Sequence, residues 1–191
     1  MSKLIRKATK IMLIRHAEKP EQGADTQGVT LKGERSKESL AVRGWQRAGA
    51  LTSIFAPSDG HFQHAALAKP KFLYASKALK RKGSKRSIQT ITPLAEKLNL
   101  KINDDFPRSQ FENMLEEVYL CNGVVLICWQ REYIPNIADY ILNNDETAPR
   151  VWPEDRFDMV WVFDLKRSSA GYGFKQVPQR LLPGDTSTRI S

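Results

Sequence analysis

The chain has 191 residues, of which 41% are hydrophobic and 27% are charged. This composition predicts one globular domain spanning residues 1–191, and no stretch approaches the roughly 18 apolar residues that a transmembrane helix needs. The formal charge of +9 favours anionic partners, which include phosphorylated small molecules, nucleic acid and acidic lipid. The N-terminal residues lack the long apolar region and cleavage site of a secretory signal, so we expect a cytoplasmic protein that is not bound to a membrane.

Four short apolar runs predict strands that are buried on both faces of a sheet, because their hydrophobic residues follow one another without alternating with polar ones. The runs are residues 11–14, 72–75, 124–128 and 160–163. Between them, apolar residues at helical spacing predict four helices. The apolar faces are Trp45, Ala48, Leu51 and Phe55; Ile88, Ile91, Leu94, Ala95 and Leu98; Phe111, Leu115 and Val118; and Ile137, Ala138 and Ile141.

Strands that alternate with helices predict an α/β three-layer sandwich, in which a mostly parallel sheet has helices on both faces. Residues 21–38 and 77–84 are polar and are expected to be loops, and the segment from about residue 177 is expected to be an irregular tail. Neither Cys121 nor Cys128 has a partner at disulfide-motif or zinc-ligand spacing, so the sequence predicts neither kind of site.

Chemically active side chains follow three of the predicted strands. Arg15 and His16 come directly after the first strand. Arg86 follows the second strand at the start of a helix, and Arg131 follows the third. Because ligands of open α/β sheets bind beyond the carboxyl ends of the strands, we expect these side chains at one rim. Each one alone is typical of a solvated surface, but together a nucleophilic imidazole and phosphate-matching guanidinium groups favour phosphoryl transfer.

Five segments resemble a known family. Residues 13–18 (LIRHAE) resemble the RHG/RHA signature of the histidine phosphatase superfamily, the phosphoglycerate-mutase-like group. Residues 44–48 (GWQRA) resemble the opening of its next helix, and residues 84–90 (SKRSIQT) match the segment with its second phosphate-binding arginine. Residues 125–129 (VLICW) and 157–161 (FDMVW) resemble a bacterial subgroup of undefined substrate. The similarity extends from the first predicted strand to the C-terminal tail.

This resemblance implies a phosphoglycerate-mutase-like fold and a phosphatase that acts on a phosphorylated small molecule. It implies that His16 is the nucleophile and becomes transiently phosphorylated, that Arg15 and Arg86 hold the phosphate oxygens, and that no metal or organic cofactor is needed. Glu18 and Lys19 follow the nucleophile directly, so we expect them to orient this loop or to contact the substrate.

One position departs from the family pattern. The family has a second histidine just after the strand at residues 124–128, and Arg131 takes that position here. The other two histidines, His61 and His64, are far from this strand in the sequence and are expected at the surface or behind the site. Arginine stabilises charge on a transferring phosphoryl group but does not readily give up a proton. Arg131 therefore indicates either phosphate binding with impaired turnover or a degenerate site.

The sequence leaves alternatives open for both the proton donor and the function. Glu112, on the third predicted helix, is the predicted donor for the leaving group, with Glu116, Glu117 and Glu132 as alternatives. The leading function is a phosphatase, and the second is a pseudo-phosphatase that binds phosphate without catalysis. A basic nucleic-acid-binding protein is disfavoured because no recognised nucleic-acid-binding signature accompanies the positive charge. The sequence indicates neither the substrate nor the oligomeric state.

Overall fold

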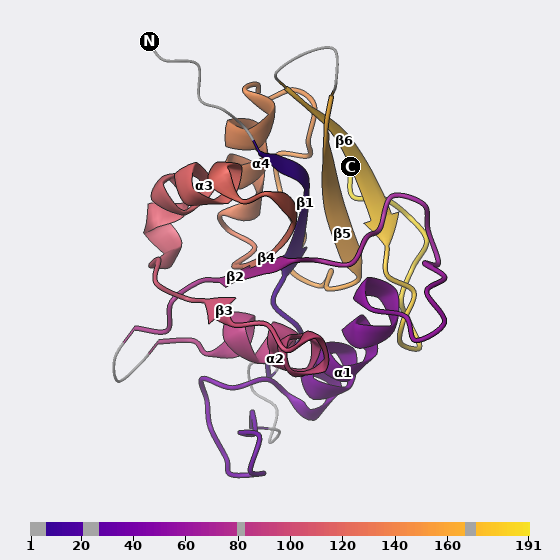
Figure 1. Ribbon diagram of the computed structural model, residues 1–191. Coiled ribbons are helices and arrows are strands. Elements are labelled where there is room, and N and C mark those ends of the chain that lie inside the picture. Colours follow the sequence, from indigo (N-terminus) through magenta and orange to yellow (C-terminus); the bar gives the residue numbers. More distant parts are fainter. Residues whose placement is uncertain (1–6, 21–26, 80–82, 167–170) are drawn as a thin grey trace.

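A mixed sheet forms the centre of the computed structural model, which describes residues 7–20, 27–79, 83–166 and 171–191. Its strands lie in the order β3-β2-β4-β1-β5-β6 (Figure 1). Strands β1 to β4 pair in parallel, whereas β5 is antiparallel to both β1 and β6. The strands are β1 (Ala8–Arg15), β2 (Phe72–Ala75), β3 (Ile102–Asn103), β4 (Gly123–Trp129), β5 (Met159–Leu165) and β6 (Tyr172–Pro178).

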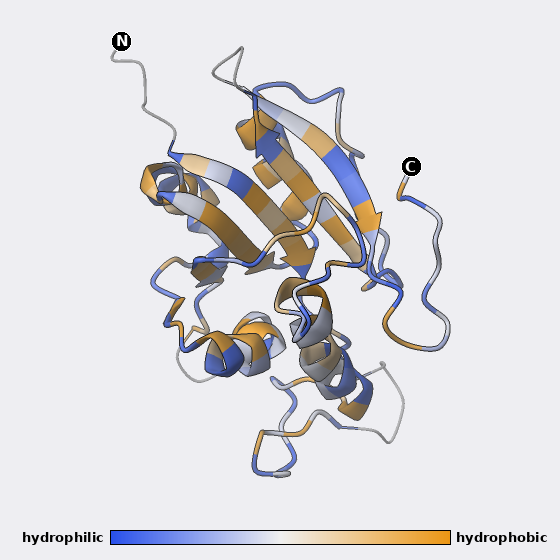
Figure 2. Ribbon diagram, turned by 45° about the vertical axis from the view of Figure 1, so that its right-hand side comes forward, coloured by the Kyte–Doolittle hydropathy of each residue, from blue (hydrophilic) through white to orange (hydrophobic). Residues whose placement is uncertain are grey.

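Helices cover both faces of this sheet, and β1 lies between two apolar clusters. Ile11 and Leu13 of β1 pack in the cluster that includes the apolar faces of α3 and α4, and Met12 and Ile14 pack in the cluster of α1 and α2. This two-sided burial explains the unbroken apolar run of β1, and the predicted α/β sandwich is confirmed (Figure 2). The helices are α1 (Val42–Phe55), α2 (Arg86–Leu98), α3 (Phe111–Leu120) and α4 (Ile134–Leu142), and a 3₁₀ turn at Arg108–Gln110 precedes α3.

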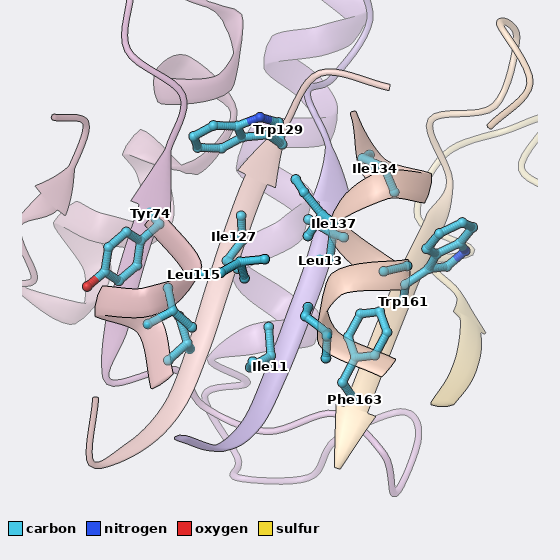
Figure 3. Packing of buried hydrophobic residues seen from close by; sticks show 14 of the residues in the cluster. Ile11, Leu13, Tyr74, Leu115, Ile127, Trp129, Ile134, Ile137, Trp161 and Phe163 are labelled. Atoms are coloured by element: carbon cyan, nitrogen blue, oxygen red, sulfur yellow. The ribbon is translucent and has the colours of Figure 1, made fainter. Parts of the chain in front are cut away.

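Large aromatic side chains fill the layer between the sheet and helices α3 and α4 (Figure 3). The rings of Trp161 and Trp152 have centroids 5.1 Å apart, and both side chains are fully buried. Trp129, at the end of β4, is also buried, and its indole N–H donates a hydrogen bond to the backbone oxygen of Arg108 at 3.1 Å. This bond fixes the beginning of α3 beside the carboxyl end of β4.

Three features of the sheet were absent from the sequence prediction. β3 has two residues, too few to produce a periodic signal, and β6 mixes polar and apolar residues without clean alternation. β5 runs antiparallel to β1, with Ile14 opposite Val160. The residues that precede Met159 therefore lie at the same edge of the sheet as the end of β1, where the parallel strands finish.

The remaining segments largely agree with the prediction. The described parts of the two expected loops have no helix or extended strand, and residues 21–26 and 80–82 of these loops lie outside the described residues. The expected irregular tail begins at about the end of β6, at Pro178. No described helix has the length and apolar character that crossing a membrane requires.

Gly44 allows the first turn of α1 to pack directly on the chain that follows β1. A Cβ atom at position 44 would overlap the backbone oxygen of Glu18. Gly49, further along the same helix, is exposed, and a Cβ there would meet no atom of its surroundings within 4 Å. The two glycines therefore provide a matched pair of sites.

Gly44→Ala is expected to lower the free energy of unfolding by about 1 kcal/mol or more, because the overlap outweighs the gain in helix propensity. Gly49→Ala is the matched control and is expected to raise it by about 0.5–1 kcal/mol, because there the gain in propensity acts alone. Urea denaturation measures both changes. Equal shifts in the two variants would contradict the close packing at Gly44.

Candidate active site

His16 follows β1 directly and is held from both its backbone and its ring. Its backbone N–H donates to the backbone oxygen of Trp129 at 3.1 Å, and Nδ1 donates to the oxygen of Ala17 at 2.7 Å. The tautomer fixed by this second bond leaves Nε2 with an unshared electron pair. Burial, together with the charges of Arg15 and Arg86, lowers the pKa of His16 to about 3, although the hydrogen bond to Ala17 acts in the opposite direction. The imidazole is therefore neutral at physiological pH.

Hydrogen bonds connect the loop after His16 to α2. The backbone N–H of Ala17 donates to Oγ1 of Thr90 at 2.8 Å, and the Thr90 hydroxyl donates to the backbone oxygen of Arg86 at 2.7 Å. One helix therefore positions the loop after His16 and one of the predicted phosphate-binding arginines. Because these bonds involve backbone atoms on both sides, the spacing between His16 and the start of α2 is well defined.

The guanidinium group of Arg15 lies against the segment that leads into β5. Its Nη1 donates to the backbone oxygens of Glu154 at 2.6 Å and Arg156 at 2.9 Å, and its Cζ lies 3.7 Å from the ring centroid of Phe157. Burial, followed by the charge of Arg131, lowers the pKa of Arg15 to about 10, so it remains a cation at neutral pH. Its Nε is buried and has no hydrogen-bond partner among the described residues. That N–H is a donor that suits an anionic ligand.

Arg86 opens α2 and is also held by backbone carbonyls. Its Nε donates to the oxygen of Ser39 at 3.1 Å, and its Nη2 donates to the oxygen of Lys37. Burial lowers the pKa of Arg86. Since Arg86 in turn lowers the pKa of His16, the two side chains belong to one electrostatic cluster. This placement agrees with the expectation that the residues after the first two predicted strands lie close together.

Lys19 and Arg131 share the carboxylate of Glu154. Lys19 Nζ lies 3.0 Å from Glu154 Oε1, and Arg131 Nη2 lies 3.6 Å from the same atom. Arg131 also lies near Glu132, with 3.5 Å between its Nε and Oε1 of that residue. The hydrogen bond from Lys19, with the charges of Lys19 and Arg131, lowers the pKa of Glu154. The site thus contains its own carboxylate, that of Glu154, which balances the charge of two of its cations.

Glu18 pairs with a buried arginine, which fits the first of its two expected roles, orienting the loop, and leaves contact with the substrate a prediction. Its carboxylate accepts hydrogen bonds from Nη2 of Arg47 at 2.8 Å and from Nε at 3.0 Å, and Arg47 is only 3% exposed. Nη2 of Arg47 also bonds Asp185 at 2.7 Å, and its Nη1 bonds Gln179 at 3.0 Å. Glu18 therefore neutralises a buried cation, and through Arg47 it connects the loop after His16 to α1 and the C-terminal segment.

The predicted proton donor, Glu112, and the two other histidines are exposed. Glu112 is exposed in the first turn of α3, which the Trp129 bond places beside the end of β4. No hydrogen bond or ion pair between described residues joins Glu112 to the cations of the site, so its role stays a prediction. His61 and His64 are exposed in the segment between α1 and β2, as expected.

The sequence did not indicate that Glu154 and Phe157 are neighbours of Arg15. The reason is the antiparallel direction of β5, which brings the residues before that strand to the rim. The resemblance of residues 157–161 to the bacterial subgroup was a signal for this segment, but it carried no information on direction. Within the described ranges, no three His, Cys, Asp or Glu side chains are grouped so that they could hold a metal ion.

Solved phosphatase structures share this fold. A protein assigned as an alpha-ribazole-5'-P phosphatase from Escherichia coli matches with a TM-score of 0.56 and 12% identity, over 93% of this chain and 100% of that chain. A phosphoserine phosphatase mutant from Entamoeba histolytica, in complex with phosphoserine, matches with a TM-score of 0.54 and 11% identity, over 86% and 95% of the two chains. A protein assigned as the phosphohistidine phosphatase SixA from Agrobacterium tumefaciens matches with a TM-score of 0.51 and 15% identity, over 88% and 96%.

These structures belong to the histidine phosphatase superfamily, and the fold that the resemblance implied is confirmed. Identities this low establish a shared fold and leave the activity to be argued from the site. No protein-family model and no curated protein sequence matches the chain.

We expect the Cε1–H resonance of His16 in the folded protein to show no titration between about pH 5 and 8. The folded pKa of about 3 lies below the ordinary value of about 6.5, so the unfolded chain binds a proton that the folded chain does not. His16 therefore lowers the free energy of unfolding as the pH falls from about 6.5 towards 3. Proton NMR measures the titration, and the same resonance in urea serves as the control. A folded midpoint near 6.5 would contradict the buried, neutral imidazole.

Arg47→Ala is expected to lower the free energy of unfolding by about 3 kcal/mol or more, because it leaves the carboxylates of Glu18 and Asp185 buried without their cation. Arg43→Ala is the matched control on the same helix. Nε of Arg43 lies 3.3 Å from Glu18, but its side chain is 46% exposed, so a loss below about 1 kcal/mol is expected. Chemical denaturation compares the variants, and similar losses in both would argue against a buried ion network.

Proposed function

We propose that this chain is a phosphomonoesterase that transfers the phosphoryl group of its substrate to Nε2 of His16 and then to water. The observation that carries the proposal is a buried, neutral imidazole at the end of the central strand, inside the positive field of Arg15 and Arg86. A neutral imidazole attacks phosphorus, and the cations attract and orient the phosphate that it attacks. The phosphatase fold of the chain supports the same reaction class.

Substrate binding uses cations that the fold holds without neutralising them. Arg15 and Arg86 are bonded to backbone carbonyls, which position the guanidinium groups but leave their positive charge in place. Lys19 and Arg131 are instead paired with Glu154. A substrate phosphate competes with Glu154 for these two side chains, so they join the phosphate when the carboxylate moves aside.

In the first step, the lone pair of Nε2 forms a bond to phosphorus while the bond from phosphorus to the leaving oxygen breaks. The leaving oxygen takes a proton, and Glu112 remains the proposed donor. The imidazole becomes a cation when it is phosphorylated, and the hydrogen bond from its Nδ1 to the oxygen of Ala17 stabilises that charge. Arg15 and Arg86 stabilise the charge on the phosphoryl oxygens.

In the second step, a water oxygen forms a bond to phosphorus and the bond between phosphorus and Nε2 breaks. The electron pair of that bond returns to Nε2, and a water proton passes to the carboxylate of the donor, which restores its acid form. The net reaction converts a phosphomonoester and water into an alcohol and inorganic phosphate. No metal or organic cofactor enters either step.

A pseudo-phosphatase remains the second candidate, because Arg131 stands in place of a histidine and is engaged by Glu154. An arginine at this position holds phosphate but does not exchange a proton with the reacting groups. We therefore propose slow turnover rather than none, on a phosphorylated small molecule in the cytoplasm. Phosphate binding is common to both candidates, and turnover distinguishes them.

The purified protein is expected to hydrolyse p-nitrophenyl phosphate without added metal, and His16→Ala should reduce the rate by at least about a hundredfold because the nucleophile is lost. His64→Ala is the control and should keep the wild-type rate, since His64 is exposed and outside the cluster. Mass spectrometry under alkaline conditions should detect phosphate on His16 during turnover. Hydrolysis that survives in His16→Ala would exclude this nucleophile, and phosphate binding without hydrolysis in the wild type would favour the pseudo-phosphatase.

A further inference from the structure

Gln130 is the residue beside His16 on the neighbouring strand. Arg15 pairs with Trp129 in the parallel β1–β4 ladder, and the backbone N–H of His16 donates to the oxygen of Trp129. The next residue along β4 is Gln130, so the two residues that leave these strands are neighbours. Adjacent strands of a sheet lie about 4.8 Å apart, which brings the side chains within reach of one ligand.

The side chains of His16 and Gln130 also leave the sheet on the same face. Side chains alternate between the faces of a strand, and Ile14 and Cys128 both pack in the cluster of α1 and α2. His16 and Gln130 lie two positions beyond these residues and therefore point to the same side. For Gln130, this direction agrees with the hydrogen bond that its Nε2 donates to Ser76 Oγ at 2.6 Å.

A chain of hydroxyl groups links Gln130 to the first turn of α2. Ser76 Oγ lies 2.9 Å from Ser87 Oγ, and Ser87 follows Arg86 directly. The same turn is joined to the loop after His16 through Thr90. Gln130, His16 and the N-terminal turn of α2 therefore surround one region, to which the backbone N–H groups of the helix also contribute positive potential.

One end of the Gln130 amide has no partner in this region. The residue is 7% exposed, and its Oε1 is buried without a hydrogen bond to any described residue. Leaving a buried polar atom unpaired costs about 1–3 kcal/mol, and a catalytic role or a bound partner is among the reasons that folded proteins keep such an atom. A half-turn of the amide exchanges its oxygen and nitrogen. Ser76 Oγ then donates to Gln130 and accepts from Ser87 Oγ, which reverses the direction of the bond between the two hydroxyl groups. The unpartnered end then presents N–H donors.

We propose that the side-chain amide of Gln130 donates a hydrogen bond to an oxygen of the phosphoryl group that His16 attacks. This inference rests on the proposed function for the identity of the ligand as a phosphoryl group. The amide supplies a neutral donor, so it binds the oxyanion without adding another cation to a site that contains several.

Two variants test whether the Gln130 side chain contacts the anion or has only a structural role. Gln130→Ala removes the donor, and affinity for orthovanadate, an analogue of the phosphoryl group in transfer, is expected to fall at least about tenfold. Gln130→Glu keeps the shape and can still accept a hydrogen bond from Ser76, but it faces the anion with a negative charge. It should bind orthovanadate more weakly than Gln130→Ala does. Gln176→Ala, which removes a glutamine that bonds Ile190 of the C-terminal segment, is the control and should bind as the wild type does.

Isothermal titration with orthovanadate measures affinity without requiring turnover, and thermal unfolding verifies that each variant is folded. Wild-type affinity in Gln130→Ala or Gln130→Glu would overturn the inference, whether or not the protein hydrolyses phosphate esters. Weakened binding in both variants, with hydrolysis absent from the wild type, would uphold the contact and reject the proposed phosphatase activity. Absence of orthovanadate binding to the wild type would overturn the inference, and His16-dependent hydrolysis would then still support the proposed function.

Discussion

The backbone hydrogen bond from His16 to Trp129 extends the β1–β4 ladder beyond the end of β1, and the arrangement of the site depends on it. A slip of one residue would turn His16 to the opposite face of the sheet, away from α2 and Arg86. The apolar residues of β1 do little to prevent such a slip, because both faces are buried. The polar residues that follow supply the register: Arg15 bonds the carbonyls before β5, and Glu18 bonds Arg47.

The site concentrates positive charge by two different physical means. Arg47, Lys19 and Arg131 are compensated by carboxylates, which allows cations to be placed in or near the protein interior. Arg15 and Arg86 are held by neutral carbonyl groups instead. Carbonyl dipoles fix a guanidinium group and stabilise it, but they do not cancel its charge. These two arginines can therefore act on an incoming anion and on the imidazole, whose neutral form they favour.

The antiparallel direction of β5 determines which residues lie near Arg15 and His16. In a wholly parallel sheet, every strand would contribute the residues that follow it to the edge where β1 ends. Here β5 contributes the residues that precede it, and Glu154 and Phe157 lie around Arg15 as a result. β6 returns towards the same edge, so the C-terminal segment can contribute Asp185 to the ion network of Arg47. The last part of the chain thus supports the loop that follows its first strand.

The apolar runs predicted the layered α/β fold, because strands buried on both faces of a sheet produce such runs. The carboxyl ends of parallel strands meet at one edge, which predicted that Arg15, His16 and Arg86 lie close together. The direction of β5 emerged from the folded structure alone, because a continuous apolar run does not encode the direction of a strand. The folded structure also showed the partner of Glu18, since nothing in the sequence around this carboxylate indicates the buried arginine with which it pairs. The same limit applied to Gln130, whose place beside His16 follows from the register between two strands more than a hundred residues apart.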